Sequence, residues 1–381
     1  MVSACPACGA RVEPGDQFCE ACGGLLGAGP ATDVSAGGTG TVGDPDGRGA
    51  GNSIEPTAAG PSPAAALERS MPTAPAVSGG STNPCASCGA PPTDIDADGY
   101  CSVCGLLQPG PRDHLEIDLG WAAGVTDRGR SHPRNEDAFH IELAGPEADH
   151  GVVAVVCDGV SSSVRAEDAS ESAAIAAATV LAAVVPGAGP LATATVHAAD
   201  AANRAVAALP WTPTGQLASP SCTLVSAACR EGEMAVGWVG DSRAYWIGGA
   251  PESIRQLTVD HSWAEAQVET GRMTELEAEA DPRSHAITRW IGADAPAIDA
   301  QVVTMALTLP GRLLLCSDGL WNYASSTADM ANLLAGQPPQ ATPIELARSL
   351  TEFALGAGGH DNITVVVIDL PGLRAEEKGT A

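Results

Sequence analysis

The order of strand-like and helix-like segments after Pro111 constrains the fold of this chain most. Short runs rich in Val, Ile, Leu and aromatic residues end in Gly, Asp or Ser, as buried strands do. They lie at 117–125, 139–143, 152–157, 223–229, 234–239, 244–247, 312–316 and 363–368. Helix-like stretches span 166–184, 191–209, 262–280 and 343–355. Strands in series with helices in pairs predict a layered α+β domain in which helices cover the sheet faces.

The segment before Pro111 contains eight of the 12 cysteines, in two copies of one pattern. The first copy is Cys5, Cys8, Cys19 and Cys22, and the second is Cys85, Cys88, Cys101 and Cys104. A Cys-x2-Cys pair points two thiolates at one centre, so two pairs complete a tetrahedral Zn²⁺ site. Redox-active pairs or disulfides are the competing interpretation, and disulfides are rare inside cells.

Both cysteine units resemble zinc ribbons and are too short to fold around a hydrophobic core. Metal binding would supply most of the folding free energy of each unit, with one structural Zn²⁺ apiece. An Asp-rich stretch at 94–99 matches the start of an EF-hand loop, but the twelfth position is Gly105, where Ca²⁺ binding requires a Glu. The residues between the units, 27–84, are rich in Gly, Ala, Pro, Ser and Thr and predict a disordered linker.

Charge excludes several classes of function. The net charge is −27; residues 1–114 carry 4 basic and 12 acidic side chains, and the remainder carries 15 and 34. Binding to nucleic acid needs cations that neutralise phosphates, so neither nucleic acid nor an anionic membrane is an expected partner. The only lysine is Lys378, which excludes a P-loop lysine, a kinase-type lysine and a Schiff base.

No targeting or membrane segment is apparent. Residues 1–15 lack the basic region and the apolar run of a signal peptide. The longest apolar stretch, 173–185, is Ala-rich and shorter than the roughly 20 residues that a membrane helix needs. We therefore expect a soluble, cytoplasmic protein.

Carboxylates recur where the expected strands begin or end, each beside a small or polar residue. They are Glu136 and Asp137, Asp158, Asp241, Asp318 and Asp361. A single Asp-Gly after a strand is usually an ordinary turn, but five such places in one domain favour a shared site. Carboxylates that meet at one rim repel one another unless a cation neutralises them. Hard oxygen ligands suit Mg²⁺ or Mn²⁺, and two such ions can bind a phosphate and activate a water.

An ordered set of motifs resembles the metal-dependent protein phosphatases, the PPM or type 2C family, in its bacterial branch. The motifs are Thr126-Asp127-Arg128-Gly129, Asn135-Glu136-Asp137-Ala138, Cys157-Asp158-Gly159, Ser221-Cys222-Thr223-Leu224, Gly240-Asp241-Ser242-Arg243-Ala244-Tyr245, Asp260-His261-Ser262, Leu314-Leu315-Cys316-Ser317-Asp318-Gly319 and Gly359-His360-Asp361-Asn362-Ile363-Thr364. The resemblance covers roughly residues 117–369. It implies an α-β-β-α sandwich of two antiparallel sheets between helix pairs.

The resemblance also implies a role for each acidic residue. Asp158 would bridge two Mn²⁺ or Mg²⁺ ions, with the Gly159 carbonyl on one of them. Asp318 and Asp361 would complete the first metal, Glu136 would face the second, and Asp241 would help to hold the third ion of bacterial members. Asp137 would orient a metal-bound water that attacks phosphorus directly, so no cysteine nucleophile is needed. The residues from Asp260 to about Arg289 would form a flap beside the site.

The expected domains are a zinc ribbon at 1–26, a disordered linker at 27–84, a second ribbon at 85–110, a phosphatase domain at 115–370 and a flexible tail at 371–381. The expected substrates are phosphoserine and phosphothreonine proteins that Ser/Thr kinases modify. The expected role of the ribbons is to bind a protein partner or to regulate access to the site.

The sequence departs from the family pattern at two places. The family usually places an Arg four residues before the Glu of Asn-Glu-Asp, where this chain has His132; Arg134 is the nearby candidate for binding phosphate. After Asp158-Gly159, the usual Met, two Gly and His are replaced by Val160 and serines at 161–163. His132, His140 and His261 are candidate proton donors, against the default of a structural histidine.

Two other functions remain open from the sequence. A phosphatase-like scaffold that binds phosphoproteins without hydrolysing them would keep the fold, although such proteins often lose a metal-binding Asp and none of the expected ones is missing here. A nucleic-acid binder built on the zinc ribbons is disfavoured by the acidic charge of both parts of the chain.

Overall fold

The computed structural model describes residues 3–4, 11–12, 84–85, 88–96, 99–105, 108–145, 151–213, 217–248, 254–295 and 298–372. The chain divides into two compact units. One contains residues 109–381 with two N-terminal stretches, 1–12 and 18–24, and the other contains residues 13–17 and 25–108. Four Cys of the predicted ribbons, Cys5, Cys8, Cys19 and Cys22, lie outside the described residues.

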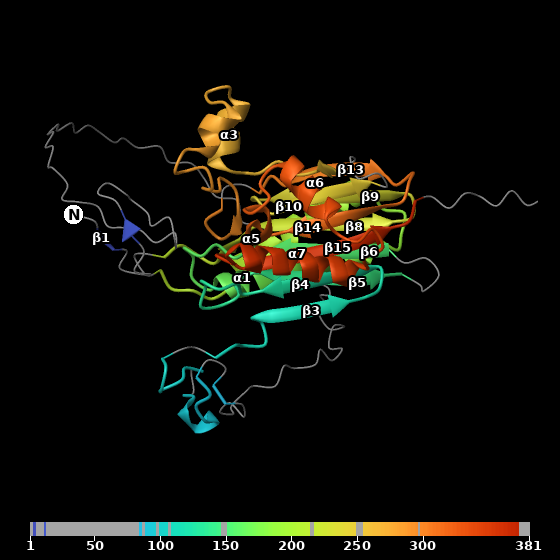
Figure 1. Ribbon diagram of the computed structural model, residues 1–381. Coiled ribbons are helices and arrows are strands. Elements are labelled where there is room, and N and C mark those ends of the chain that lie inside the picture. The colour runs from blue at the N-terminus through green and yellow to red at the C-terminus, as the bar shows by residue number, and fades with distance from the viewer. Residues whose placement is uncertain are drawn as a thin grey trace, which may run out of the picture. The chain divides into compact units, whose positions relative to one another are not determined.

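Two antiparallel sheets form the centre of the larger unit (Figure 1). The first has the strand order β11-β10-β14-β15-β4-β3 and the second has the order β13-β9-β8-β6-β5. The first consists of β3 (His114–Asp118), β4 (Ala122–Asp127), β10 (Arg243–Gly248), β11 (Ile254–Gln256), β14 (Gly311–Cys316) and β15 (Ile363–Leu370). The second consists of β5 (Ala138–Ala144), β6 (Gly151–Cys157), β8 (Leu224–Arg230), β9 (Glu233–Val239) and β13 (Gln301–Ala306). Short pairs are β1 (Ser3–Ala4) with β2 (Arg11–Val12), and β7 (Ser221–Cys222) with β12 (Ile291–Gly292).

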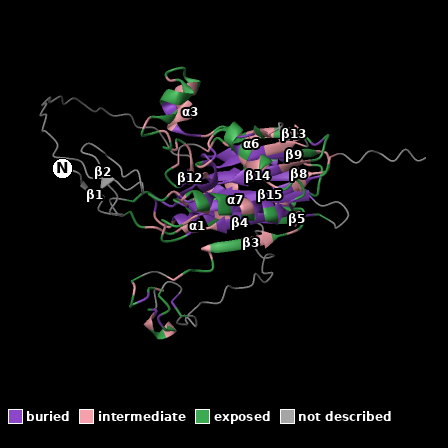
Figure 2. Ribbon diagram, viewed as in Figure 1, coloured by how far each residue is buried: buried purple, intermediate pink, exposed green. Residues whose placement is uncertain are grey.

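Three apolar layers hold the sandwich together. The middle layer lies between the sheets and contains Val156, Val236, Leu315 and Val366, all with 0% exposure. Helices cover the outer faces, with α1 (Ala166–Val184) and α2 (Leu191–Ala207) on the second sheet and α5 (Asp318–Trp321), α6 (Thr327–Ala335) and α7 (Pro343–Ala357) on the first. Figure 2 shows these buried faces continuing through both sheets.

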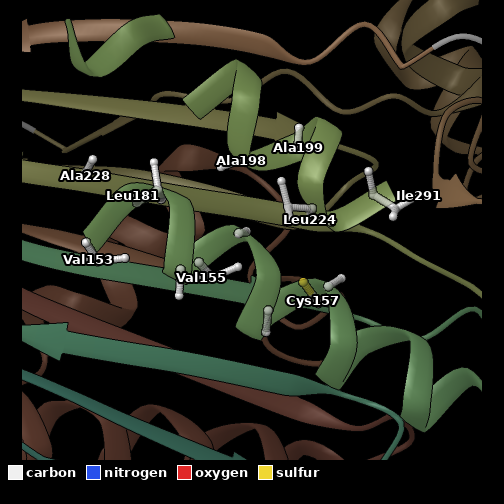
Figure 3. Close-up of a cluster of buried hydrophobic side chains, with 14 of the residues drawn as sticks. Val153, Val155, Cys157, Leu181, Ala198, Ala199, Leu224, Ala228 and Ile291 are labelled. Atoms are coloured by element: carbon white, nitrogen blue, oxygen red, sulfur yellow. The ribbon is translucent and has the colours of Figure 1, made fainter. Parts of the chain in front are cut away.

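The Ala-rich helix α1 explains how the outer layer on the second sheet packs. Ala169, Ala173, Ala177 and Leu181 recur at four-residue spacing, so they lie on one face of the helix. All four are buried against the second sheet and α2 in the cluster shown in Figure 3. Small side chains allow the helix to approach the sheet closely, and the predicted span 166–184 agrees with the observed bounds.

The predicted α+β sandwich is confirmed, with two local corrections. The run 117–125 was expected as one strand but forms β3 and β4, because Gly120 adopts φ +80 in the turn and its amide donates to Asp118 Oδ1 (2.9 Å). The stretch 262–280 was expected as one helix but forms α3 (Trp263–Glu269) and α4 (Glu275–Glu279). Gly271, at φ +66, follows α3, and the Thr274 capping box starts α4.

Several short or edge elements were not predicted, among them β13, β11 and α6. Edge strand β13 alternates exposed and half-buried positions, so it lacks the continuous apolar run that marked the central strands. Strand β11 is three residues long, and α6 has Met330 as its buried residue. None of the described helices is both long and apolar enough to cross a bilayer.

Candidate active site

The acidic residues of the sequence motifs meet where strands of both sheets begin or end. Glu136 and Asp137 precede β5, Asp158 and Gly159 follow β6, Asp241 lies after β9, Asp318 follows β14 and Asp361 lies before β15. The Asp158 carboxylate feels the charges of four others: Asp137, Asp318, Asp361 and Asp241. Antiparallel pairing therefore gathers side chains from distant parts of the chain at one rim.

Burial and mutual repulsion make these carboxyls hard to ionise. The pKa of Asp137 and that of Asp241 are each raised to about 7, chiefly by burial and also by neighbouring carboxylates. The pKa of Asp158 and that of Asp318 lie well above the ordinary value for the same two reasons. Burial is also the main cause of the raised pKa of Glu136. Such a cluster is stable as carboxylates only beside a cation.

Two buried oxygens in the cluster have no hydrogen-bond partner among the described residues: Asp137 Oδ1 and Asp318 Oδ1. A buried polar atom without a partner is costly. An oxygen-preferring divalent cation and a water bound to it would satisfy both atoms and relieve the repulsion. Carboxylates and a backbone carbonyl are donors that suit Mg²⁺ and Mn²⁺. The residues present therefore fit a divalent metal site.

Hydroxyl side chains from the first sheet orient Asp137. Ser317 Oγ and Thr364 Oγ1 each donate to Asp137 Oδ2 at 2.7 Å. The other carboxylate oxygen, Oδ1, accepts no hydrogen bond from the described residues. The Asp137 amide donates to Asn135 Oδ1 at 3.2 Å. Asp137 is 2% exposed, so these contacts fix its carboxylate firmly.

Asn362 fastens the loop at 128–136 to the start of β15. Its Nδ2 donates to the carbonyls of Arg128 (2.7 Å) and Arg134 (3.0 Å), and its Oδ1 accepts from the Glu136 amide (2.7 Å). Its own amide donates to Asp361 Oδ1 (2.8 Å). One side chain thus sets the position of the loop that carries Glu136 and Asp137 relative to Asp361.

Two glycines in the motifs lie where no side chain fits. A Cβ on Gly159 would lie 2.7 Å from the carbonyl oxygens of both Ala166 and Glu136. A Cβ on Gly319 would lie 1.9 Å from the carbonyl oxygen of Asn362. Close backbone approach at the turns after β6 and β14 is what brings Asp158 and Asp318 into the cluster.

The candidate phosphate-binding residues take up different positions. His132 Nε2 lies 3.2 Å from Asp361 Oδ1, so this imidazole faces the carboxylate cluster. Arg134 Nη1 lies 3.6 Å from Glu167 Oε1, and its side chain is 61% exposed. Arg134 is therefore accessible to a ligand on this loop, as is the exposed Arg130.

The other two candidate histidines make different contacts. The Gly240 amide donates to His261 Nδ1 at 3.0 Å, and burial lowers the pKa of His261 to about 4. The ring is therefore neutral near pH 7 and positions the Gly240–Asp241 turn. His140 lies on β5 with Nε2 3.5 Å from Glu142 Oε2.

An ion pair that sequence reasoning did not assign joins the base of the flap to the site. Arg243 donates to both oxygens of Asp260, with Nη2 2.7 Å from Oδ2, and its guanidinium lies 3.7 Å from the Trp321 ring centre. Trp321 Nε1 donates to the Asp241 carbonyl at 3.0 Å. Both residues belong to motifs that resemble the phosphatase family, Arg243 to the motif at 240–245 and Asp260 to the motif at 260–262. The motifs could have identified the two residues, but they do not show that the residues pair. Beyond this base, α3 stands clear of the layers in Figure 1.

The second cysteine unit, which belongs to the smaller unit of the chain, brings its four thiols together. The Sγ atoms of Cys85, Cys88, Cys101 and Cys104 lie within 4.8 Å of one another. None of these cysteines is in a disulfide. Among the described residues, no other three or more His, Cys, Asp or Glu residues have ligand atoms that all lie within 4.8 Å of one another. The carboxylate oxygens of the acidic cluster lie further apart. Within the Asp-rich stretch, Asp96 Oδ1 accepts from the Tyr100 amide, as in a turn.

Comparison with known proteins places this geometry among phosphatases. Residues 127–353 match the family model described as Protein phosphatase 2C. The serine/threonine phosphatase stp of Listeria welshimeri is 34% identical over 148 residues, which cover 39% of this chain and 56% of the relative. The chain thus spans about half the length of this curated relative.

Two solved structures share the fold. The PPM Ser-Thr phosphatase MsPP from Mycobacterium smegmatis, in complex with cacodylate, is 33% identical with a TM-score of 0.53, covering 65% of this chain and 97% of that chain. The catalytic domain of the phosphatase PstP, in complex with two manganese ions, is 29% identical with a TM-score of 0.53, covering 66% and 97%.

Proposed function

Because the chain belongs to the protein phosphatase 2C family, we propose that residues 115–370 hydrolyse phosphoserine and phosphothreonine in proteins with Mn²⁺ or Mg²⁺. The observation that carries the proposal is the buried cluster of Asp137, Asp158, Asp241 and Asp318, whose charges need a cation. The names of the relatives, which are Ser/Thr phosphatases, support the same chemistry. The substrates are then phosphorylated products of Ser/Thr kinases.

We propose for each acidic residue the metal-binding role that the family resemblance implies. Asp158 would lie between two ions, with the Gly159 carbonyl on one of them; Asp318 and Asp361 would bind the first ion, and Glu136 would face the second. Asp241, bonded through its own carbonyl to Trp321, is assigned to a third ion. The unpartnered Oδ1 of Asp318 supports its role as a ligand.

When bound, the ions would supply a nucleophilic water and would neutralise charge that develops on the phosphate. The protein residues do the positioning. Asp137, fixed by Ser317 and Thr364, directs its Oδ1 so as to orient the attacking water. His132 orients Asp361, and Arg134 at the open rim binds the phosphate oxygens of the substrate.

Arg134→Ala tests the phosphate-binding assignment. We expect KM for a phosphothreonine peptide to rise about 3- to 10-fold with little change in kcat, since an exposed charge pair contributes modestly to binding. Steady-state kinetics of the full chain in Mn²⁺ measure both constants. Arg204→Ala, an exposed arginine on α2, is the matched control. An unchanged KM in Arg134→Ala would remove this residue from the site.

A phosphoprotein-binding scaffold is the second candidate. His132 favours it, because this residue stands where the family usually has a phosphate-binding Arg and faces Asp361 instead. Such a scaffold would bind Mn²⁺ and a phosphopeptide but release no phosphate. Measuring peptide binding and phosphate release on the same sample separates the two functions.

We further propose a structural Zn²⁺ in each cysteine unit, in a chain that works in the cytoplasm, where thiols stay reduced. The grouping of Cys85, Cys88, Cys101 and Cys104 supports the second site; the first unit lies outside the described residues and stays a prediction. A protein partner is the proposed ligand of these units.

Cys88→Ser tests the second zinc site. The full chain should contain about two Zn²⁺ by elemental analysis, and the variant about one, because a missing thiolate weakens a tetrahedral site strongly. Ser102→Ala, which lies between Cys101 and Cys104, should leave the zinc content unchanged. Equal zinc contents in Cys88→Ser and the native chain would contradict the assignment.

A further inference from the structure

The loop that follows Asp158-Gly159 is firmly built, although its sequence departs from the family pattern. The Val160 amide donates to the Ser221 carbonyl (3.0 Å), and the Val164 amide donates to the Ala218 carbonyl (3.1 Å). The Ala218 amide donates back to the Ser162 carbonyl (3.2 Å). The segment 160–164 is thus paired along its length with residues 218–221.

Arg165 anchors the end of this loop. Its φ is +56, which is uncommon for a residue other than glycine. Its Nε donates to Asp168 Oδ2 (2.7 Å) and its Nη1 to the Pro210 carbonyl (2.7 Å). An unfavourable backbone conformation persists only where the surrounding contacts hold it in place. These contacts fix the end of the loop, and the backbone pairing fixes the rest, so the exposed Ser161 and Ser162 have defined positions.

One of these hydroxyls contacts a proposed metal ligand. Ser161 Oγ donates to Glu136 Oε2 at 2.9 Å. The backbone of Glu136 is already fixed, since its amide donates to Asn362 and its carbonyl accepts from Gly159 (3.2 Å) and Ser170 Oγ (2.5 Å). What remains free is the side chain, with three rotatable bonds. Within the described part of the chain, Ser161 is the hydrogen-bond donor to that carboxylate.

We infer that Ser161 is a positioning residue that holds the Glu136 carboxylate in the orientation needed to bind a divalent cation. The inference rests on the proposed function only for the statement that Glu136 faces a metal. Groups that hydrogen-bond a ligating carboxylate commonly change metal affinity by about 10- to 100-fold when removed. A single exposed, neutral hydroxyl lies at or below the low end of that range.

The test measures Mn²⁺ binding to the full chain directly, by calorimetric titration in the absence of substrate. Ser161→Ala should weaken one class of Mn²⁺ sites about 3- to 10-fold, because its hydroxyl contributes one hydrogen bond. Ser161→Thr retains the hydroxyl and should restore the affinity. Ser162→Ala should bind Mn²⁺ like the native chain, because Ser162 contacts Ala218 through its backbone carbonyl, which the substitution keeps.

A double-mutant cycle identifies Glu136 as the group through which Ser161 acts. In a Glu136→Ala background, which removes the acceptor, Ser161→Ala should cause no further loss of Mn²⁺ affinity, since no coupling remains between the two positions. Unchanged Mn²⁺ binding in Ser161→Ala would overturn the inference. So would an effect confined to KM for a phosphopeptide, which would place Ser161 on the substrate. If the native chain binds Mn²⁺ but hydrolyses nothing, the proposed function fails while the Ser161 effect on Mn²⁺ affinity still decides this inference.

Discussion

Asp158→Asn is expected to lower kcat/KM for a phosphothreonine peptide by a factor of about 10³ or more. Metal ions stabilise the transition state by several kcal/mol. A loss of about 1.36 kcal/mol of this stabilisation lowers the rate tenfold. Asp158 is surrounded by the charges of four other carboxylates, so its substitution should disturb the whole metal site. Phosphate release at saturating and limiting peptide measures the loss.

The same substitution should not unfold the protein, and this separates a chemical role from a structural one. Burial and neighbouring carboxylates raise the pKa of Asp158 well above its ordinary value. Near pH 7 the unfolded chain has this group ionised at no cost, whereas the metal-free folded state must either hold a proton or bury a repelled charge. Asn removes that cost, so metal-free Asp158→Asn should melt at or above the temperature of the native chain.

Added Mn²⁺ should then distinguish the two proteins. A ligand at 100 times its Kd stabilises the native state by about 2.7 kcal/mol, so the native chain should gain thermal stability and Asp158→Asn should gain less. Full activity in the variant, or a lower melting temperature than the native chain without metal, would contradict the assignment of Asp158 as a metal ligand.

Gly129→Ala is expected to lower the free energy of unfolding by about 2–5 kcal/mol, which combines left-handed backbone strain with overpacking. Gly129 has φ +72, and a Cβ there would lie 2.1 Å from the Asp361 carbonyl oxygen and 2.8 Å from that of Gly359. The collision would separate the loop at 128–136 from the start of β15. Urea unfolding of the full chain measures the change.

Gly120→Ala is the matched control for this prediction. Gly120 has φ +80, close to that of Gly129, but a Cβ there would meet nothing within 4 Å. It should therefore cost only the backbone strain, about 1–2 kcal/mol. Equal losses in the two variants would show that the loop does not approach Asp361 as closely as the structure has it.

The layered fold was largely predictable because apolar runs and helical spacing are local properties. Helix α1 and the central strands β6 and β15 follow from such patterns. The hairpin at Gly120 could not be predicted in this way. Apolar residues lie on both sides of Gly120, so the sequence looks like one continuous strand. Edge strand β13 was missed for the opposite reason, since its outer face is in water and interrupts the apolar pattern.

The candidate site was predictable only in part. Ordered motifs marked every acidic residue that the structure brings together, but the residues that orient them make contacts across the whole chain. Ser317 and Thr364 reach Asp137 from 180 and 227 positions away, and no local pattern reports such pairs. His261 shows the same limit, because its low pKa comes from burial, which the motif does not reveal.

Release of phosphate from a phosphothreonine peptide by the native full chain, with Mn²⁺ and with a chelator in its place, tests the central claim most directly. The buried carboxylate cluster predicts release that requires the metal. A chain that binds Mn²⁺ and the peptide yet releases no phosphate would contradict the claim and favour the scaffold.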